Sequence, residues 1–308
     1  MFIKDPNDFS FPKEALLRVP KLPYKHLGSG KVRELYDLGE ELLMIATDRV
    51  SAFDVILHEG IPGKGIILTQ MSLFWFDYLK DVVPNHIVPN HNKRLLAVLA
   101  DYPELYKRSM IVKKLKPLPI ESIVRGYLAG NAWRNYQDTD RLWDMELPNG
   151  MKEFDALPEP AVTPTTKAKK GHDEPLYHEQ AADLLGEDLF SQVKEKSIAL
   201  FKNASQRIEE SHFILADAKM EFGVDEANQL YLIDEAFTPD SSRFWLKKDY
   251  ETSNLPTGFD KQIIRNYLLS LGWSTKPPIP SLPLDIITQT QIRYMEVFEH
   301  IVYRPSFT

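Results

Sequence analysis

The chain has 308 residues, of which 43% are hydrophobic and 26% are charged, as in an ordinary soluble globular protein. Its formal net charge of −7 argues against a nucleic-acid-binding surface, and the lack of cysteine excludes disulfides, thiolate metal sites and cysteine nucleophiles. No apolar run approaches the ~20 residues of a membrane span, and the acidic, proline-containing N-terminus is unlike a signal peptide. We therefore expect a cytoplasmic protein that binds neither nucleic acid nor membrane.

The predicted elements mix strands and helices without the regular alternation that a parallel sheet requires. The first is a β-hairpin over residues 25–47, with a glycine-rich turn. The later elements, in chain order, are two helices (68–79 and 93–99), a strand (110–115), an extended loop region (144–175), a helix-rich stretch (177–211), a second hairpin (215–234) and two helices (260–271 and 284–302). This order favours an α+β architecture.

The glycine-rich turn reads Gly28-Ser29-Gly30-Lys31, which looks at first like part of a phosphate-binding P-loop. It is not a P-loop, because the spacing of the glycines does not match and valine follows the lysine where serine or threonine is needed. A glycine-rich hairpin turn can still cover nucleotide phosphates, and Lys31 and Arg33 share one face of the strand. The alternative is a flexible turn followed by solvated bases.

Polar side chains also gather just after the second strand of this hairpin. Asp48, Arg49, Ser51 and Asp54 place two acids, a base and a hydroxyl within seven residues. Such density at a strand end suits a small polar ligand. A local turn with an ion pair explains the same residues.

A third polar segment, from Arg125 to Asn131, contains a guanidinium beside a glycine-bounded turn that we expect to open a helix. Arginine is the preferred bidentate partner of phosphate, and a helix N-terminus adds backbone donors. The alternative is an arginine paired with Glu121 on a helix surface.

The loop from Thr163 to Glu174 carries both bases and acids, among them Lys167, His172 and Asp173. It is either a mobile basic loop over an active site or a solvated charge run. The single His-Asp pair is a weak indication of a metal site.

The second hairpin is the most informative part of the sequence. Alternation over 215–223 places Asp217, Lys219 and Glu221 on one face of a strand and four apolar side chains on the other. A second strand ends at Asp234 and continues into a polar loop that reaches Arg243. Carboxylates beside a lysine can hold a divalent cation against phosphate oxygens. A half-solvated sheet gives the same alternation.

Together, these segments closely resemble the SAICAR synthetase family, the phosphoribosylaminoimidazole-succinocarboxamide synthases of purine biosynthesis. The resemblance rests on five stretches that follow the family order along nearly the whole chain: 30–36, 48–54, 125–131, 215–223 and 234–243. It implies a single-function enzyme of the fungal and bacterial type. The implied fold is α+β, with an N-terminal antiparallel-sheet lobe (1–115) that covers the nucleotide and an ATP-grasp-like catalytic lobe (116–308) with C-terminal helices.

The activity that the resemblance implies is the ATP-dependent ligation of L-aspartate to carboxyaminoimidazole ribonucleotide (CAIR), which gives SAICAR, ADP and phosphate. Phosphorylation of the CAIR carboxylate would give an acyl phosphate that the aspartate amine attacks. The implied cofactors are ATP and Mg²⁺, and the implied partners are these small molecules alone. The protein is expected to be a monomer or a small homo-oligomer.

The resemblance also implies roles for individual residues. Lys219 would stabilise the transferring phosphoryl group, and Asp217 is our candidate general base for the aspartate amine. The implied metal ligands are Glu221 and Asp234. The phosphates of ATP would contact Lys31 and Arg33. Its adenine would contact the 113–118 segment, which includes Lys113, Lys116 and Leu118. The implied substrate-binding residues are Asp48, Arg49, Ser51, Arg125, Asn131, Lys167, Asp173, Asp240, Ser242 and Arg243.

The sequence departs from the family pattern at one position, where Asn131 replaces the usual serine. An amide can donate a hydrogen bond to phosphate but is longer than a hydroxyl, so the geometry of the 5′-phosphate site can differ. Two other functions fit parts of the pattern. One is a different ATP-dependent carboxylate–amine ligase or small-molecule kinase, and the other is a nucleotide-binding regulatory protein that lacks catalysis.

Overall fold

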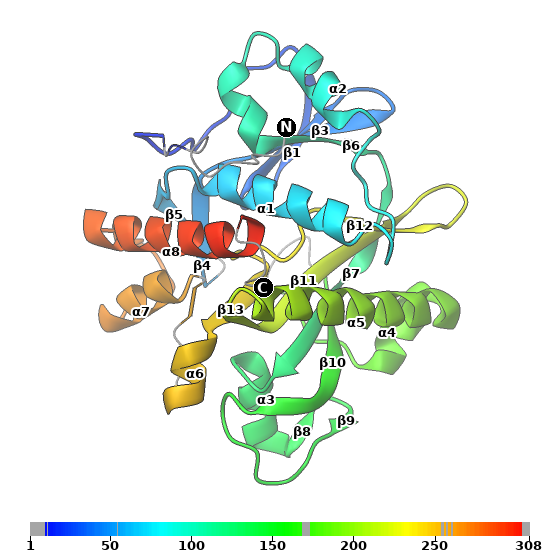
Figure 1. Ribbon diagram of the computed structural model, residues 1–308, viewed down its shortest axis with the longest axis vertical. Coiled ribbons are helices and arrows are strands. Elements are labelled where there is room, and N and C mark those ends of the chain that lie inside the picture. The colour runs from blue at the N-terminus through cyan, green and yellow to red at the C-terminus, as the bar shows by residue number, and fades with distance from the viewer. Residues whose placement is uncertain are drawn as a thin grey trace.

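The computed structural model describes residues 10, 12–53, 55–167, 173–253, 256, 258–259 and 261–303. A four-stranded antiparallel sheet is built from the first part of the chain, in the order β1-β2-β3-β6 (Figure 1). Its strands are β1 (Lys25–Ser29), β2 (Arg33–Asp37), β3 (Glu41–Ala46) and β6 (Ser109–Lys113). The predicted hairpin is confirmed as β2 and β3, and the glycine-rich segment precedes it: Gly28 and Ser29 end β1, an extra strand that was not predicted, and residues 30–32 form the turn into β2.

The second sheet is larger and holds the polar hairpin. It is antiparallel, in the order β10-β7-β11-β12, and β13 pairs with the start of β11. Its strands are β7 (Lys116–Tyr127), β10 (Ala156–Thr166), β11 (Phe213–Val224), β12 (Leu230–Ile233) and β13 (Ser242–Leu246). The predicted hairpin at 215–234 is therefore confirmed as β11 and β12.

Helices α4 (His178–Leu185) and α5 (Glu187–Glu209) follow β10, and α5 crosses the large sheet (Figure 1). The apolar residues of β11, among them Ala218, Met220 and Phe222, are buried with Leu200 and Phe201 of α5 in the main core. Because side chains alternate along a strand, the charged residues of β11 must lie on the other face of the sheet. Burial of one face thus fixes the register that exposes the polar face.

The other elements surround these two sheets. Helices α1 (Lys64–Tyr78) and α8 (Leu284–Val302) pack against each other and contribute to the main core. The rest are β4 (Arg49–Ala52), β5 (Val55–Gly60), α2 (His91–Val98), the 3₁₀ helix η2 (Pro103–Arg108), α3 (Asn131–Thr139), β8 (Arg141–Leu142), β9 (Met145–Glu146), α6 (Lys247–Ser253) and α7 (Gln262–Ser270). These mixed elements confirm the α+β class.

One local prediction was wrong and another was confirmed. Prolines favoured a loop over 144–175, yet β10 lies there; it is an edge strand, where proline is tolerated, and its pairing with β7 is interrupted between Ala156 and Ala161. The predicted turn that opens a helix within 125–131 is confirmed, since α3 begins at Asn131 directly after Gly130; Arg125 itself lies before this turn, within β7.

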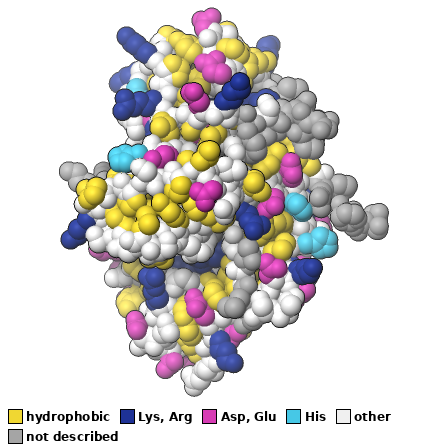
Figure 2. All heavy atoms as spheres, turned by 90° about the vertical axis from the view of Figure 1, so that its left-hand side faces the viewer, with side chains coloured by type: hydrophobic (Ala, Val, Ile, Leu, Met, Phe, Trp, Pro, Cys, Tyr) yellow, Lys and Arg dark blue, Asp and Glu magenta, His cyan; other side chains and the backbone are white. Residues whose placement is uncertain are grey.

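One face of the described part of the molecule shows how its charged side chains are distributed (Figure 2). Figure 2 shows acidic and basic side chains interspersed over the described part of one face, without the broad basic area that nucleic-acid binding requires. Among the residues that the structure describes, no helix is both long and apolar enough to cross a membrane.

Candidate active site

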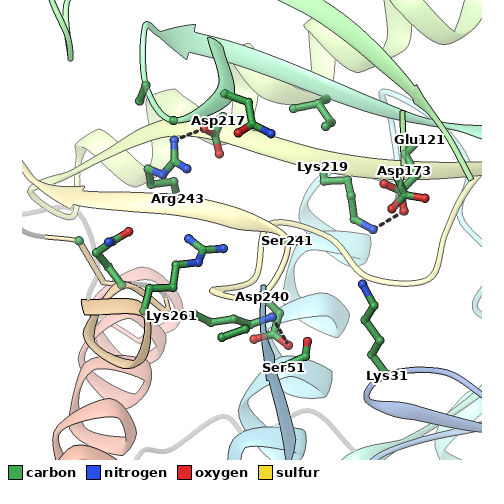
Figure 3. A pocket seen from close by; sticks show the side chains of 18 of the residues that line it. Lys31, Ser51, Glu121, Asp173, Asp217, Lys219, Asp240, Ser241, Arg243 and Lys261 are labelled. Atoms are coloured by element: carbon green, nitrogen blue, oxygen red, sulfur yellow. Dashed lines mark hydrogen bonds and ion pairs between the residues drawn. The ribbon is translucent and has the colours of Figure 1, made fainter. Parts of the chain in front are cut away.

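A cleft of about 1120 Å³ lies over the polar face of the large sheet. Strands β7 and β11 supply its floor, the β1–β2 turn and the loop between β12 and β13 supply its sides, and the starts of α3 and α7 reach its rim (Figure 3). The strand register explains why charged groups converge there. Glu121 is the partner of Glu221 across β7 and β11, and Asp217 is the partner of both Arg125 and Arg243.

Lys219 lies between two carboxylates in the middle of the cleft. Its Nζ is 2.5 Å from Glu121 Oε1 and 3.5 Å from Glu221 Oε1. Burial lowers the pKa of Lys219, but Glu221 and Glu121 outweigh it and hold the pKa above its usual range. The ammonium is therefore held charged and in a fixed place, as stabilisation of an anionic group requires.

The two glutamates around this lysine differ from each other. Burial raises the pKa of Glu121, and the nearby carboxylates of Glu221 and Asp173 raise it further against the effect of Lys219. Burial also acts on Glu221, but Lys219 and Lys167, which donates a hydrogen bond to Glu221, lower its pKa overall. Glu221 is thus the carboxylate of the pair that is held ionised.

Asp234 and Glu235 follow β12 and face Arg33 from the small sheet. Arg33 Nη1 is 3.1 Å from Asp234 Oδ2, and Nη2 is 3.0 Å from Glu235 Oε2. Asp234 has a φ of +66°, which is rare outside glycine and is often found at functional sites. Burial raises the pKa of Asp234 to about 6; the carboxylates of Glu221 and Glu235 add to this effect, and Arg33 opposes it. A further cation near these acids would relieve their repulsion.

The oxygen set formed by Glu221 and Asp234 suits Mg²⁺, which is often held by one or two carboxylates together with substrate phosphates. The described residues contain no ready-made group of three or more histidine, aspartate or glutamate ligands. A metal at this place would therefore need further oxygen ligands from a nucleotide or water. The structural feature that fits such a cation is the burial of Asp234 beside the carboxylates of Glu221 and Glu235.

Two arginines share one aspartate at the other end of the cleft. Arg243 Nη1 is 2.7 Å from Asp217 Oδ2, and Arg125 Nη1 is 3.9 Å from the same oxygen. Burial lowers the pKa of Arg125 to about 10; Asp217 opposes this effect and Arg243 adds to it. Two guanidiniums against one carboxylate leave a positive charge that suits a phosphate dianion. Gly130 leaves room for the Arg243 guanidinium, because a Cβ there would lie 3.0 Å from Arg243 Nη2.

The structure brings most of the sequence-predicted site residues into this cleft. Those that line it are Lys31, Arg33, Ser51, Arg125, Asn131, Lys167, Asp173, Asp217, Lys219, Glu221, Asp234, Asp240 and Arg243. Asp54 and His172, which belonged to predicted motifs, lie outside the described residues. One cleft therefore joins segments that are up to about two hundred residues apart in the chain, as in the ion pair of Arg33 with Asp234.

Asp48 and Arg49 do not line the cleft. Asp48 is fully buried, accepts hydrogen bonds from the backbone N–H groups of Leu16 and Gly65, and pairs with Arg108 at 2.9 Å. Its carboxylate is satisfied within the fold, so the expected substrate contact is not supported by its position. Arg49 donates to the backbone carbonyls of the glycine-rich turn, at Gly30 and Lys31, both at 3.0 Å. It holds the turn instead of facing the cleft.

Four other predicted residues also lie outside the cleft lining. The ammonium of Lys113 lies over the ring of Tyr231, 4.4 Å from its centroid, and the Lys116 side chain is exposed. Leu118 and Ser242 are buried, the leucine within the main core. None of these four side chains lines the cleft.

Sequence reasoning missed several cleft residues. Glu121 was considered only as a partner of Arg125, because its place opposite Glu221 depends on the pairing of strands far apart in the chain. Lys261, beside α7, lines the cleft although no motif marks it. Glu235 pairs with Arg33, and its position directly after Asp234 was the one available signal.

Comparison with known proteins points to one family. The SAICAR synthetase family model matches residues 26–280. A phosphoribosylaminoimidazole-succinocarboxamide synthase of Thermodesulfovibrio yellowstonii is 49% identical, over 93% of this chain and 98% of that protein. One of Schizosaccharomyces pombe is 46% identical, over 91% and 94%. The solved SAICAR synthase of Saccharomyces cerevisiae, complexed with SAICAR, has a TM-score of 0.82 and 38% identity and covers 92% of this chain and 98% of its own.

Proposed function

The chain belongs to the SAICAR synthetase family, and from this premise we propose how its cleft divides the work of the reaction among its residues. The protein is an ATP-dependent carbon–nitrogen ligase of purine biosynthesis that joins L-aspartate to CAIR and gives SAICAR, ADP and phosphate. The observation that carries the division of roles is the layout of the cleft. A carboxylate–lysine cluster lies at its centre, and a pair of arginines lies at one end.

The chemical problem is that a carboxylate is a poor electrophile. In our proposal the CAIR carboxylate attacks the γ-phosphorus of ATP, ADP leaves, and an acyl phosphate forms. The aspartate amine then attacks the acyl carbon, the C–O bond to phosphate breaks, and the amine loses a proton. Catalysis of such steps depends mainly on positioning and on neutralisation of charge.

In this proposal the phosphates of ATP are bound by Lys31, Arg33 and Lys219. Lys31 lies on the glycine-rich turn that Arg49 holds through its backbone carbonyls, so it is presented from an ordered loop. Arg33 is oriented by Asp234 and Glu235. Lys219, fixed between two glutamates, would stabilise the transferring phosphoryl group.

Glu221 and Asp234 are the residues that we propose to hold Mg²⁺. Their acid oxygens suit the ion, and the pKa of Asp234, raised to about 6 by burial among acids, marks a place where a cation is favourable. A bound Mg²⁺ would neutralise charge on the phosphate oxygens. Lys167 pairs with Glu221 and neutralises part of the charge of this carboxylate.

Arg125 and Arg243 are proposed to bind the 5′-phosphate of CAIR, with Asn131 at the N-terminus of α3 beside them. Arg125 Nε donates to Thr163 Oγ1 at 2.8 Å, which fixes the plane of its guanidinium. The contact of Asp217 with Arg243 supports an orienting role for this acid more directly than general-base help to the amine. We keep the general-base role as the second possibility for Asp217.

The remaining expectations are also part of the proposal. Residues 1–115 and 116–308 would form the two lobes, since each sheet lies wholly within one of these ranges. The 113–118 segment, which joins the sheets, would meet the adenine through its backbone. We propose the cytoplasm as the compartment, and a monomer or small homo-oligomer as the assembly.

The test of the function is ADP release by the purified protein when each substrate is omitted in turn. We expect ADP only when ATP, CAIR and L-aspartate are all present, or a slow release with CAIR and ATP if the acyl phosphate hydrolyses. ADP release with a different amine in place of L-aspartate would favour another carboxylate–amine ligase. Stoichiometric ADP without any amine would favour a kinase, and binding of ATP without turnover would favour a regulatory protein.

A further inference from the structure

A buried lysine lies behind the cleft without lining it. Lys64 is the first residue of α1, its side chain is 0% exposed, and its Nζ is 2.6 Å from Asp240 Oδ2. Burial lowers the pKa of Lys64, although Asp240 opposes the effect. A positive charge at a helix N-terminus also opposes the helix dipole. Since buried ion pairs add little net stability, this costly arrangement needs another explanation.

The acid that Lys64 holds is a meeting point of three helical segments. Asp240 Oδ1 accepts a hydrogen bond of 2.7 Å from the Tyr294 hydroxyl of α8, and Oδ2 is 3.3 Å from Lys261 Nζ, beside α7. The Asp240 side chain is only 4% exposed. Lys261 lines the cleft, whereas Lys64 and Tyr294 do not. Asp240 is therefore placed to orient Lys261 more than to touch a substrate itself.

The loop that carries Asp240 also reaches Lys219. The backbone carbonyl of Ser241 accepts the N–H of Lys219 at 2.7 Å, and the N–H of Asp240 donates to Thr238 Oγ1 at 3.2 Å. Thr238 in turn donates to the Glu235 carboxylate. The loop is thus anchored to the centre of the cleft by contacts that do not use the Asp240 side chain, so a change at this carboxylate can leave Lys219 and Glu235 in place.

We propose that Lys64 and Tyr294 are positioning residues that act through Asp240. They fix its carboxylate so that Lys261 is presented to the cleft on the side of Arg243, away from Lys31 (Figure 3). We call the contacts of Lys64 and Tyr294 with Asp240 the Asp240 clamp. Because that side of the cleft is the end proposed for CAIR, the Asp240 clamp serves CAIR binding and not ATP binding. This inference rests on the proposed function for the identity of the substrate at that end.

Tyr294→Phe is the variant that tests the Asp240 clamp, because it keeps the buried ring and removes one hydrogen bond to a charged group. We expect the KM for CAIR to rise about tenfold, since such bonds are among the stronger ones, with the KM for ATP unchanged. Tyr24→Phe is the matched control. It removes a hydrogen bond of the same 2.7 Å length, to Val98 O, far from the cleft. The control should change neither KM.

A second measurement asks whether Tyr294 acts through Asp240. If it does, Tyr294→Phe should have little further effect on the KM for CAIR in an Asp240→Asn background. Full additivity of the two variants, or a Tyr294→Phe protein with a lower Tm but an unchanged KM for CAIR, would overturn the proposal. Lys64→Met can fail to fold, so the outcome does not depend on it. An inactive wild-type protein would instead refute the proposed function.

Discussion

Replacement of Asp234 by asparagine should stabilise the ligand-free protein at neutral and alkaline pH. The pKa of the Asp234 carboxyl is about 6 in the folded protein, against an ordinary value of 3.8, because burial beside Glu221 and Glu235 outweighs the attraction of Arg33. A shift of about two pKa units corresponds to about 3 kcal/mol. The side chain is 24% exposed, so screening by water reduces the effect to about 1 to 2 kcal/mol.

The sign of the pH dependence follows from the direction of the shift. The folded protein binds this proton more tightly than the unfolded chain does, so the free energy of unfolding falls as the pH rises from about 4 to about 6 and stays lower above that range. Asp234→Asn removes the titrating group. Its advantage over the wild type should be full at about pH 8 and about half as large at about pH 5.

Urea unfolding without Mg²⁺ or nucleotide measures this difference, and the buried Trp75 and Trp245 provide a fluorescence signal. The same variant should lose most of the Tm increase that Mg²⁺ with ATP gives the wild type, because one of the two proposed metal ligands is gone. Asp234→Asn that is less stable than the wild type at both pH values would refute the reasoning. It would mean that the ion pair with Arg33 outweighs burial.

Lys219→Met should lower kcat by about a hundredfold or more, as loss of a preorganised charge does. The control is Lys247→Met, which removes a lysine that pairs with a glutamate outside the cleft and should leave steady-state rates unchanged. Gly130→Ala should raise the KM for CAIR, since the φ of Gly130 is +59° and the new Cβ would crowd the neighbouring cleft arginine. The control is Gly39→Ala, at a φ of +89° with open space around it, which should lower stability but leave the KM for CAIR unchanged. Arg49→Lys should raise the KM for ATP, because an ammonium cannot make all of the hydrogen bonds with which the guanidinium holds the glycine-rich turn; an unchanged KM would show that the turn is held by other contacts.

The charged face of β11 could be predicted from the sequence because its period of two is local. Burial of Met220 and Phe222 on one face leaves Lys219 and Glu221 on the other, whatever the rest of the fold does. The partner strand β12 was located differently, by the turn residues at 225–228 and by the short apolar run that follows them, all of which is buried. Helices with clear apolar spacing, such as α8, were also predicted closely.

What the sequence could not supply was the partner of each strand. Glu121 faces Glu221 only because β7 pairs with β11 in one register, and no local pattern encodes that register. The proline-rich β10 was missed because an edge position, which makes proline acceptable, is a property of the whole sheet. Lys64 was missed for a similar reason: its partner Asp240 is 176 residues away in the chain.

The most direct test of the account is the fate of a carboxylate oxygen of CAIR. With CAIR labelled with heavy oxygen in its carboxylate, complete turnover with ATP and L-aspartate should transfer one labelled oxygen to the inorganic phosphate, because the acyl phosphate breaks at its C–O bond. Mass spectrometry of the phosphate gives the answer. Phosphate without label, alongside normal formation of SAICAR, would contradict activation of the carboxylate by phosphoryl transfer in this cleft.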